Sequence, residues 1–327
     1  MIELIGYNDQ INLLLNSYKT NNLHSSIILH GPKGIGKKLF VYKFISEIIK
    51  LNFKDKNYLH HINLLKNNSH PNIRLIKKEI NQKTKKLNNS ILINQVRNLK
   101  KFCNESSSIK DINKIIIIDS ADDLNINSAN SLLKTLEEPK KNTLIFLISH
   151  QLSSLLPTIR SRCLKVKFNK HSYENFKSIL DKQINEIKIE EIEFYYDLTS
   201  GSPGNSISFH NSNLMEIFDM TLNIFTSENI NNQSIELSNL ISKLDNDSFK
   251  NYLSLLKSII ITLNKLKFND FELNNYLSNK FKILKKISES LTKQNLIDRF
   301  DFLSNNENDL FTYNLDKKLF MLKFLTS

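Results

Sequence analysis

The sequence predicts an α/β protein, in which a parallel β-sheet is flanked by helices and is followed by helices alone. Three short apolar runs, at residues 25–30, 113–122 and 142–149, have the length and the β-branched content of buried strands. Between these runs, apolar residues recur at helical spacing, as in residues 39–49. Strands that alternate with helices along a chain are typical of a parallel sheet.

After residue 207 the chain is predicted to be entirely helical. Apolar residues recur at helical spacing in residues 214–225, 252–268 and 319–327, without strand-like alternation. The polar segment at residues 306–318 is predicted to be a loop. Because 327 residues with 40% apolar content exceed what one core usually organises, we expect two or three domains.

The composition excludes several classes of protein. Only two cysteines occur, Cys103 and Cys163, and their spacing suits neither a disulfide framework nor a zinc site. The longest aliphatic run, residues 115–118, is far too short to cross a bilayer, and the first residues show no leader pattern. We therefore expect a cytoplasmic protein without zinc and without a membrane partner.

The net charge of +12 is concentrated in the first 207 residues, because residues 208–327 hold fourteen basic and fourteen acidic residues. Between residues 74 and 101, nine basic residues face one acid, Glu79. Such a segment is able to hold DNA through its phosphates, although a solvated lysine-rich surface is the alternative. Its basic residues are Arg74, Lys77, Lys78, Lys83, Lys85, Lys86, Arg97, Lys100 and Lys101, of which Lys77, Lys78, Arg97 and Lys100 are our candidates for DNA contacts.

The segment "GPKGIGKK" at residues 31–38 follows the first strand and resembles a phosphate-binding loop. In such a loop, Gly31, Gly34 and Gly36 let backbone amides surround phosphate oxygens, and Lys37 neutralises them. The next position requires a hydroxyl that binds Mg²⁺, but it holds Lys38. An ammonium group has no lone pair for a metal ion. We therefore expect a weak or missing magnesium site, and leave open whether ATP binds.

The second strand also lacks part of the hydrolytic pattern. Asp119 lies where a carboxylate orients the metal ion, but Ser120 follows where a hydrolytic enzyme keeps a glutamate. A serine is a poor general base near neutral pH. Asp122 and Asp123 either begin the next helix or supply a substitute carboxylate. We therefore expect no ATP hydrolysis by this chain alone.

The sequence resembles the delta-prime subunits of bacterial DNA polymerase III, in the clamp-loader branch of the AAA+ ATPases. The resemblance covers residues 1–207 and implies a RecA-like AAA+ core at 1–166, a small helical lid at 167–207 and an all-helical collar at 208–327. It rests on eight segments: "IGYNDQI" (5–11), "GPKGIGKK" (31–38), "HPNIRLI" (70–76), "INQVRNLKKF" (93–102), "IIIIDSADDLN" (115–125), "SANSLLKTLEEP" (128–139), "LLPTIRSRC" (155–163) and "GSPGNS" (201–206).

The resemblance implies that Arg162 is an arginine finger. In this family a Ser-Arg-Cys motif, here Ser161 to Cys163, presents its arginine to ATP on a neighbouring subunit. A guanidinium suits that task because it is always charged and matches phosphate oxygens. The expected partners are gamma/tau-like and delta-like subunits, the sliding clamp and primed DNA. Together with Ser161 and Cys163, Lys134 and Glu137 of the preceding helix are expected at the subunit interface.

Several positions depart from the family pattern. The family's four-cysteine zinc module is missing, since residues 51–69 contain no cysteine. The lid has Asn205 where ATP-binding relatives commonly have arginine, and the polar sensor is either Ser149 or His150. The helix at residues 128–138 is predicted to begin with Ser128 as its N-cap.

The sequence favours a clamp-loader subunit that does not hydrolyse ATP, but two other functions stay open. One is an ATP-hydrolysing, gamma/tau-like clamp-loader subunit that tolerates Lys38 and uses Asp122 or Asp123. The other is a DNA-binding AAA+ protein outside replication, which requires the basic segment to bind DNA without partners.

Overall fold

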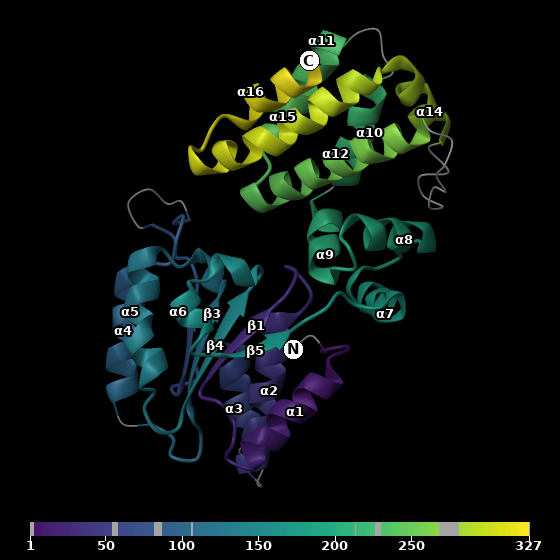
Figure 1. Ribbon diagram of the computed structural model, residues 1–327. Helices are drawn as coiled ribbons and strands as arrows, with labels where there is room; N and C mark the ends of the chain where they lie inside the picture. The colour runs from purple at the N-terminus through teal and green to yellow at the C-terminus, as the bar shows by residue number, and fades with distance from the viewer. Residues whose placement is uncertain are drawn as a thin grey trace. The chain divides into compact units, whose positions relative to one another are not determined.

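A computed structural model describes residues 3–53, 58–81, 87–105, 107–212, 214–225, 230–267 and 281–326. The chain divides into two compact units, Met1–His171 and Ser172–Ser327 (Figure 1). The first unit contains the sheet and every residue that we predicted to form a functional site. Lys83, Lys85 and Lys86 of the predicted basic segment lie outside the described residues.

A five-stranded parallel sheet forms the centre of the first unit, with strand order β2-β3-β4-β1-β5. Its register pairs His30 with Ser149 and Asp119 with Ile148, so β1, β3 and β4 end at the same edge. The predicted parallel sheet is therefore confirmed. The strands are β1 (Ser26–His30), β2 (Ile73–Ile76), β3 (Lys114–Asp119), β4 (Thr143–Ser149) and β5 (Leu164–Lys167).

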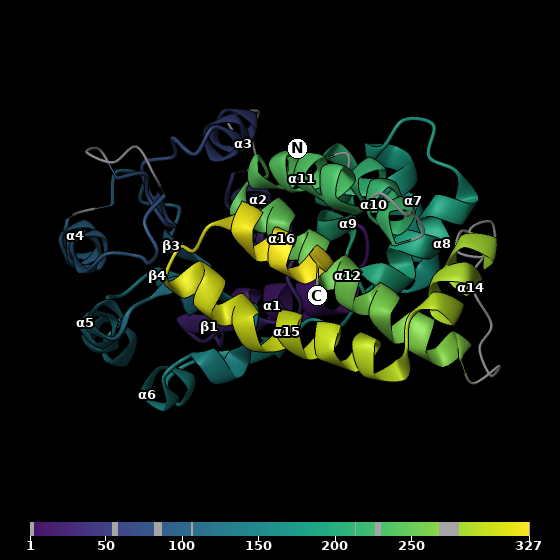
Figure 2. The ribbon, with the colours of Figure 1, turned by 90° about the horizontal axis from the view of Figure 1, so that it is seen from above.

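Helices cover both faces of this sheet (Figures 1 and 2). Strand β3 shows why, because Ile115 and Ile117 belong to one buried cluster while Ile116 and Ile118 belong to the other. The first cluster packs under α1 (Asn8–Lys19), α2 (Lys37–Asn52) and α3 (Tyr58–Lys66), and the second under α4 (Ile93–Asn104), α5 (Ile126–Glu137) and α6 (Pro157–Arg160). Two short 3₁₀ helices, η1 (Ala121–Asp123) and η2 (Leu152–Ser154), follow β3 and β4.

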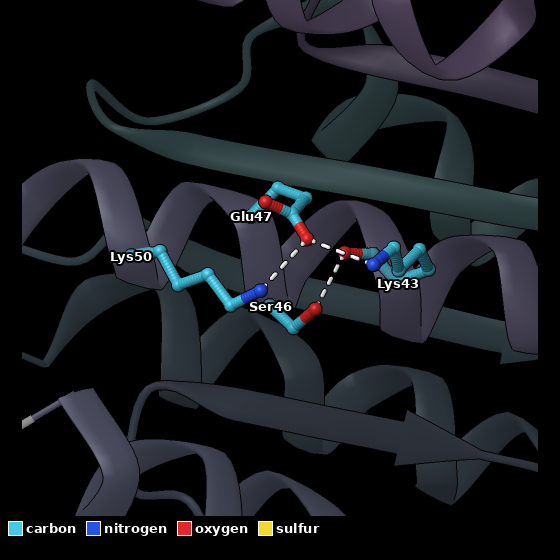
Figure 3. Close-up of polar contacts among 4 residues, drawn as sticks. All are labelled: Lys43, Ser46, Glu47 and Lys50. Carbon is cyan, nitrogen blue, oxygen red and sulfur yellow. Dashed lines mark hydrogen bonds and ion pairs between the residues drawn. The ribbon is translucent and has the colours of Figure 1, made fainter. Parts of the chain in front are cut away.

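Helix α2 follows the glycine loop and is fixed on two sides. Its apolar side chains, such as Phe40 and Phe44, are fully buried against the sheet. On the other side Glu47 forms ion pairs with Lys43 at 2.9 Å and with Lys50 at 3.1 Å, and the Ser46 hydroxyl donates to the Lys43 carbonyl (Figure 3). A well-packed helix with paired charges gives the loop a stable support.

The start of α5 corrects one prediction. The helix begins at Ile126, and Asn125 rather than Ser128 is its N-cap, since the Asn125 side chain accepts from the Ser128 amide at 2.9 Å. The Ser128 hydroxyl instead donates to the carbonyl of Ile91 at 2.7 Å in the interior. Both residue types cap helices well, and the contact with Ile91 explains the buried serine.

The second unit is helical throughout its described part, as predicted. Its helices share one apolar core that includes Phe176, Tyr195, Phe218 and Tyr252. Figure 2 shows α16 beside α11 and α15, with which it packs. The helices are α7 (Tyr173–Gln183), α8 (Ile189–Leu198), α9 (Pro203–Asn211), α10 (Leu214–Ile224), α11 (Ile230–Ser242), α12 (Asn246–Leu266), α14 (Phe281–Ser290), α15 (Lys293–Thr312) and α16 (Lys317–Thr326).

The loop predicted at residues 306–318 is mostly wrong, because α15 continues to Thr312. Leu303 and Leu310 are buried seven residues apart on one face of this helix, while Glu307 forms an ion pair with Lys257 at 2.5 Å. This part of the predicted loop is therefore helical, with Leu310 in the core and Glu307 beside it, paired with α12. No helix in the described ranges is long and apolar enough to pass through a lipid bilayer.

Candidate functional site

The glycine loop joins β1 to α2 and requires glycine at its first position. Gly31, Gly34 and Gly36 have φ angles of +147°, +79° and +93°, which side-chain-bearing residues rarely adopt. At Gly31 there is also no space, since a Cβ atom there would lie 2.1 Å from the carbonyl oxygen of Phe168. The amide of Phe168 donates to the carbonyl of His30 at 2.8 Å. The chain after β5 therefore packs directly against the loop.

Lys37 is folded back onto its own loop. The residue is only 3% exposed, and Nζ donates to the carbonyls of Gly31 at 2.6 Å and Pro32 at 2.5 Å. Burial lowers the pKa of Lys37 to about 8, and the nearby carboxylates of Asp122 and Asp119 oppose this shift only in part. The lysine expected to neutralise phosphate therefore has acceptors within the chain.

Lys38 forms an ion pair with Asp119. The Nζ–Oδ2 distance is 2.9 Å, and the two side chains are 40% and 24% exposed. These two residues stand where a phosphate-binding loop places its Mg²⁺-binding hydroxyl and its metal-orienting carboxylate. In this chain, the ammonium group of Lys38 binds the carboxylate of Asp119 at this position.

Asp122 organises the segment after β4, a role that the sequence did not indicate. Its carboxylate accepts hydrogen bonds from the hydroxyls of Ser149 (2.9 Å) and Ser154 (2.6 Å). It also accepts from the amides of His150 (2.7 Å) and Gln151 (3.2 Å). The strand register explains the contact, because the ends of β3 and β4 lie at the same edge of the sheet.

These four bonds stabilise the charged form of Asp122. Burial raises the pKa of this carboxyl, but the hydrogen bonds together outweigh burial and hold the pKa below its usual value. Both sensor candidates are engaged in this arrangement: Ser149 through its hydroxyl and His150 through its backbone amide. Burial, followed by the charge of Lys37, lowers the pKa of the His150 ring.

Arg162 lies at the corner between α6 and β5, a short turn that we call the arginine corner (residues 161–163). Its Nη1 donates to the carbonyl of Thr158 at 2.9 Å, and its Nη2 pairs with Oε1 of Glu137 at 2.6 Å. The side chains of Arg162 and Glu137 are 35% and 44% exposed. The guanidinium is thus anchored within the chain and still reaches solvent.

The other interface candidates lie in different surroundings. Ser161 is exposed, and its hydroxyl donates to the carbonyl of Thr158 at 3.1 Å. Lys134 is exposed on α5, three residues before Glu137 and on the same side of the helix. Cys163 is only 9% exposed and packs into the core, where burial raises the pKa of its thiol to about 12. Its thiol therefore packs inside the unit and not at its surface.

A known family matches the part of the chain that holds the loop and the arginine corner. The family model described as "DNA polymerase III, delta subunit" matches residues 6–172, which is more than half of the chain. The chain belongs to the DNA polymerase III delta-subunit family. All the site residues that we predicted lie within the matched segment. The predicted likeness to delta-prime subunits is confirmed by relatives that carry this name.

Two curated relatives and one solved structure illustrate the similarity. DNA polymerase III subunit delta' of Pseudomonas aeruginosa is 29% identical over 58% of this chain and 56% of its own length. Subunit gamma of Buchnera aphidicola from Schizaphis graminum is 29% identical over 60% and 53%. A gamma-subunit-related protein of Thermotoga maritima has 16% identity and a TM-score of 0.44 over 97% of this chain and 98% of its own. The chain spans about half the length of the curated relatives it matches.

The described basic residues of the segment 74–101, which we predicted to contact DNA, lie on and near α4. Lys77 and Arg97 are exposed and Lys100 is half-buried, whereas Lys78 pairs with Asp123 at 3.2 Å. Arg74 lies over the ring of Phe102 at 4.9 Å. Arg97 and Lys100 are three residues apart on α4, so they share one face of the helix.

The histidines between the loop helix and β2 form ring contacts. The rings of Phe53 and His61 are 4.5 Å apart and those of His61 and His70 are 5.4 Å apart. Burial, followed by the neighbouring histidines, lowers the pKa of His70 to about 4. Within the residues that the structure covers, no group of three or more His, Cys, Asp or Glu is placed to hold a metal ion.

Proposed function

We propose that this chain is a delta-prime-like subunit of a clamp loader, the assembly that places a sliding clamp on primed DNA. Its chemical contribution is the guanidinium of Arg162, which it supplies to ATP on a neighbouring subunit. The observation that carries the proposal is a contrast between cations. Lys37 is buried on the loop carbonyls, and Lys38 holds the carboxylate that would orient a metal ion. Arg162 stands outside the loop at the arginine corner, where two anchors fix it and its side chain is still 35% exposed.

The loop chemistry argues against hydrolysis within this chain. A magnesium ion bound here would need oxygen ligands, but Lys38 offers none and already holds Asp119. The ammonium of Lys38 would also repel a divalent cation at close range. Ser120 cannot serve as the base that activates water. A hydroxyl that binds Mg²⁺ and a general base are therefore both missing at this site.

Arg162 has the chemistry that a neighbouring active site requires. The γ-phosphate gains stabilisation from a fixed positive charge as the transition state forms, and a guanidinium matches its oxygens geometrically. An arginine supplied from another chain accelerates phosphoryl transfer by about 10³- to 10⁵-fold in known systems. A chain without hydrolysis of its own is therefore able to control the hydrolysis of its neighbour.

The test is a reconstituted complex of this chain with gamma/tau-like and delta-like subunits, the sliding clamp and primed DNA. We expect Arg162→Ala to leave assembly intact and to lower DNA-stimulated ATP hydrolysis by about tenfold or more. Lys165→Ala is the matched control, because it removes an exposed cation three residues away. Unchanged hydrolysis in the Arg162→Ala complex would refute the finger role.

The isolated chain supplies the second arm of this experiment. We expect no Mg²⁺-dependent turnover of ATP, since the loop lacks the metal ligands and the base. Steady turnover that disappears in Lys37→Ala would contradict this expectation and would favour an ATP-hydrolysing subunit. One observation favours that alternative, namely the similarity to a relative named subunit gamma. It requires Asp122 or Asp123, yet both already bind other groups of the chain.

The remaining parts of the proposal concern DNA and location. Lys77, Arg97 and Lys100 are the cations that we propose to contact DNA phosphates, and Lys78 has a weaker case because Asp123 pairs with it. DNA binding by the chain alone, with strong salt dependence, would favour an AAA+ protein outside replication. A cytoplasmic location stays a prediction.

A further inference from the structure

The ion pair between Arg162 and Glu137 joins two separate elements of the first unit. Glu137 is the last residue of α5, while Arg162 follows α6. The Nη2–Oε1 distance of 2.6 Å is that of a close, charge-assisted hydrogen bond. The carbonyl of Thr158 accepts from the other terminal nitrogen at 2.9 Å. Two acceptors therefore fix the orientation of one guanidinium group.

Helix stability does not explain the position of Glu137. A carboxylate in the last turn of a helix interacts unfavourably with the negative end of the helix dipole. Glu137 occupies the final position of α5, where a cation would stabilise the helix. Its favourable interaction in this structure is the one with Arg162. The placement of this carboxylate is therefore better explained by the arginine than by the helix.

We propose that Glu137 is a positioning residue that holds the guanidinium of Arg162 ready for phosphate on the neighbouring subunit. This inference rests on the proposed function of Arg162. An unanchored arginine side chain loses much conformational entropy when it becomes ordered on a phosphate. Anchoring it beforehand reduces the entropy that is lost on reaching the transition state. Glu137 acts through Arg162 and does not touch the reacting atoms.

The geometry leaves donors available for the phosphate. A guanidinium has five N–H donors. Nη1 uses one on Thr158 and a second, at 3.4 Å, on the hydroxyl of Ser161, and Nη2 uses one on Glu137. Among the residues that the structure describes, nothing else accepts from this guanidinium, so the N–H of Nε and the second N–H of Nη2 remain for phosphate oxygens while both anchors stay in place. Binding of the nucleotide does not require the ion pair to break.

The test compares Glu137 variants in the reconstituted complex. We expect Glu137→Ala to lower kcat for ATP about two- to fivefold, which is the range for a partly exposed ion pair, and to leave KM for ATP unchanged. Glu137→Gln should retain part of the activity, because its amide oxygen still accepts a hydrogen bond. Glu138→Gln is the matched control, since Glu138 makes no ion pair with Arg162 in the part of the chain that the structure covers.

A double-variant cycle separates positioning from a general effect on stability. In an Arg162→Ala background we expect Glu137→Ala to cause no further loss of kcat, because the group that it positions is gone. A further loss of the same size would overturn the proposal. Thermal unfolding of the isolated chain should shift by no more than about 4 °C in Glu137→Ala.

The results for the two single variants, Glu137→Ala and Arg162→Ala, also distinguish the positioning role from the finger role. Unchanged kcat in Glu137→Ala, with a large loss in Arg162→Ala, would overturn the positioning role and leave the finger role standing. A higher kcat in Glu137→Ala would show that Glu137 restrains Arg162, which also overturns the proposal. If Arg162→Ala has no effect, then both the finger role and the positioning role are wrong.

Discussion

The glycine loop and the arginine corner both hold cations near the surface of the first unit, but these cations face different groups. In the loop, Lys37 is 3% exposed and donates to two backbone carbonyls, and Lys38 pairs with Asp119. At the corner, Arg162 is 35% exposed and donates to Glu137 and Thr158. Exposure does not separate the two sites, because Lys38 is 40% exposed; they differ in what the cation holds, which is the metal-orienting carboxylate in the loop and a carboxylate on α5 at the corner.

This difference indicates that the glycine-loop motif preserves the path of the backbone better than it preserves the ligands for a metal ion. The three glycines and the following helix keep the path of a phosphate-binding loop, because the close approach of Phe168 to Gly31 depends on that path. The hydroxyl that binds Mg²⁺ in such a loop has no comparable role in packing. Lys38 is therefore able to occupy its position and to pair with Asp119. Variants of the loop glycines should therefore affect stability, whereas variants at the corner should affect the activity of the complex.

The largest expected effect on stability is that of Gly31→Ala. The new Cβ would lie 2.1 Å from the carbonyl oxygen of Phe168, so the backbone must shift, and the φ angle of +147° adds strain. We expect the free energy of unfolding to fall by more than about 3 kcal/mol. Urea denaturation of the isolated chain would measure the change.

Gly36→Ala is the matched control for this variant. Its φ angle of +93° is also unfavourable for alanine, but the nearest atom to a Cβ there is Leu4 Cδ1 at 3.7 Å. We expect a loss of about 1–2 kcal/mol from the backbone strain alone. Equal losses in the two variants would show that the contact with Phe168 does not fix the loop. A comparable loss in Arg162→Ala would remove the contrast between loop and corner.

An intermediate effect is expected for Asp122→Asn. The amide keeps the shape of the carboxylate, but its NH₂ group meets donors from Ser149, Ser154, His150 or Gln151. We expect the free energy of unfolding at neutral pH to fall by about 1–3 kcal/mol. Urea denaturation at several pH values would measure this loss and show whether the carboxylate charge causes it.

The pH dependence follows from the sign of the pKa shift. The pKa of Asp122 is lower in the folded chain than its ordinary value, because the four hydrogen bonds outweigh the effect of burial. The carboxylate therefore stabilises the fold above the unfolded-state pKa of about 3.9, and this stability is lost as the pH falls through the folded-state pKa. The difference between wild type and Asp122→Asn should be constant near neutral pH and shrink below about pH 4. A difference that does not shrink would exclude the carboxylate charge as its cause.

The strands and the loop were predictable from sequence because their signals are local. Runs at residues 25–30 and 142–149 match β1 and β4 within one residue at each end, since a buried parallel strand needs a continuous apolar segment. The glycine spacing at residues 31–36 likewise indicated the turn before α2.

The contacts that define the site were not predictable, because they join residues far apart in the chain. Asp122 meets Ser149 and Ser154 only after the register of β3 and β4 is set. The pairing of Lys38 with Asp119 depends on the order of the strands in the same way. The sequence named Glu137 as an interface candidate, but its contact with Arg162 appears only when α5 and α6 pack together.

The smallest effect on stability is expected for Lys38→Thr, and this variant tests the contrast most directly. It removes a partly exposed ion pair, which contributes about 0.2–1 kcal/mol, so the loss should resemble that in Glu137→Ala. It also restores a hydroxyl and frees the carboxylate of Asp119, which together provide oxygen ligands for Mg²⁺. We expect binding of a non-hydrolysable ATP analogue to become Mg²⁺-dependent, as calorimetry with and without the metal would show.

Lys38→Met is the control for this gain, because it removes the ammonium without supplying a hydroxyl. Hydrolysis should stay absent in Lys38→Thr, since Ser120 still occupies the place of the base. If the unaltered chain already binds the analogue more tightly with Mg²⁺, the pair with Asp119 does not exclude the metal. If neither variant gains metal dependence, then the carbonyls that hold Lys37, rather than Lys38, keep nucleotide out of the loop.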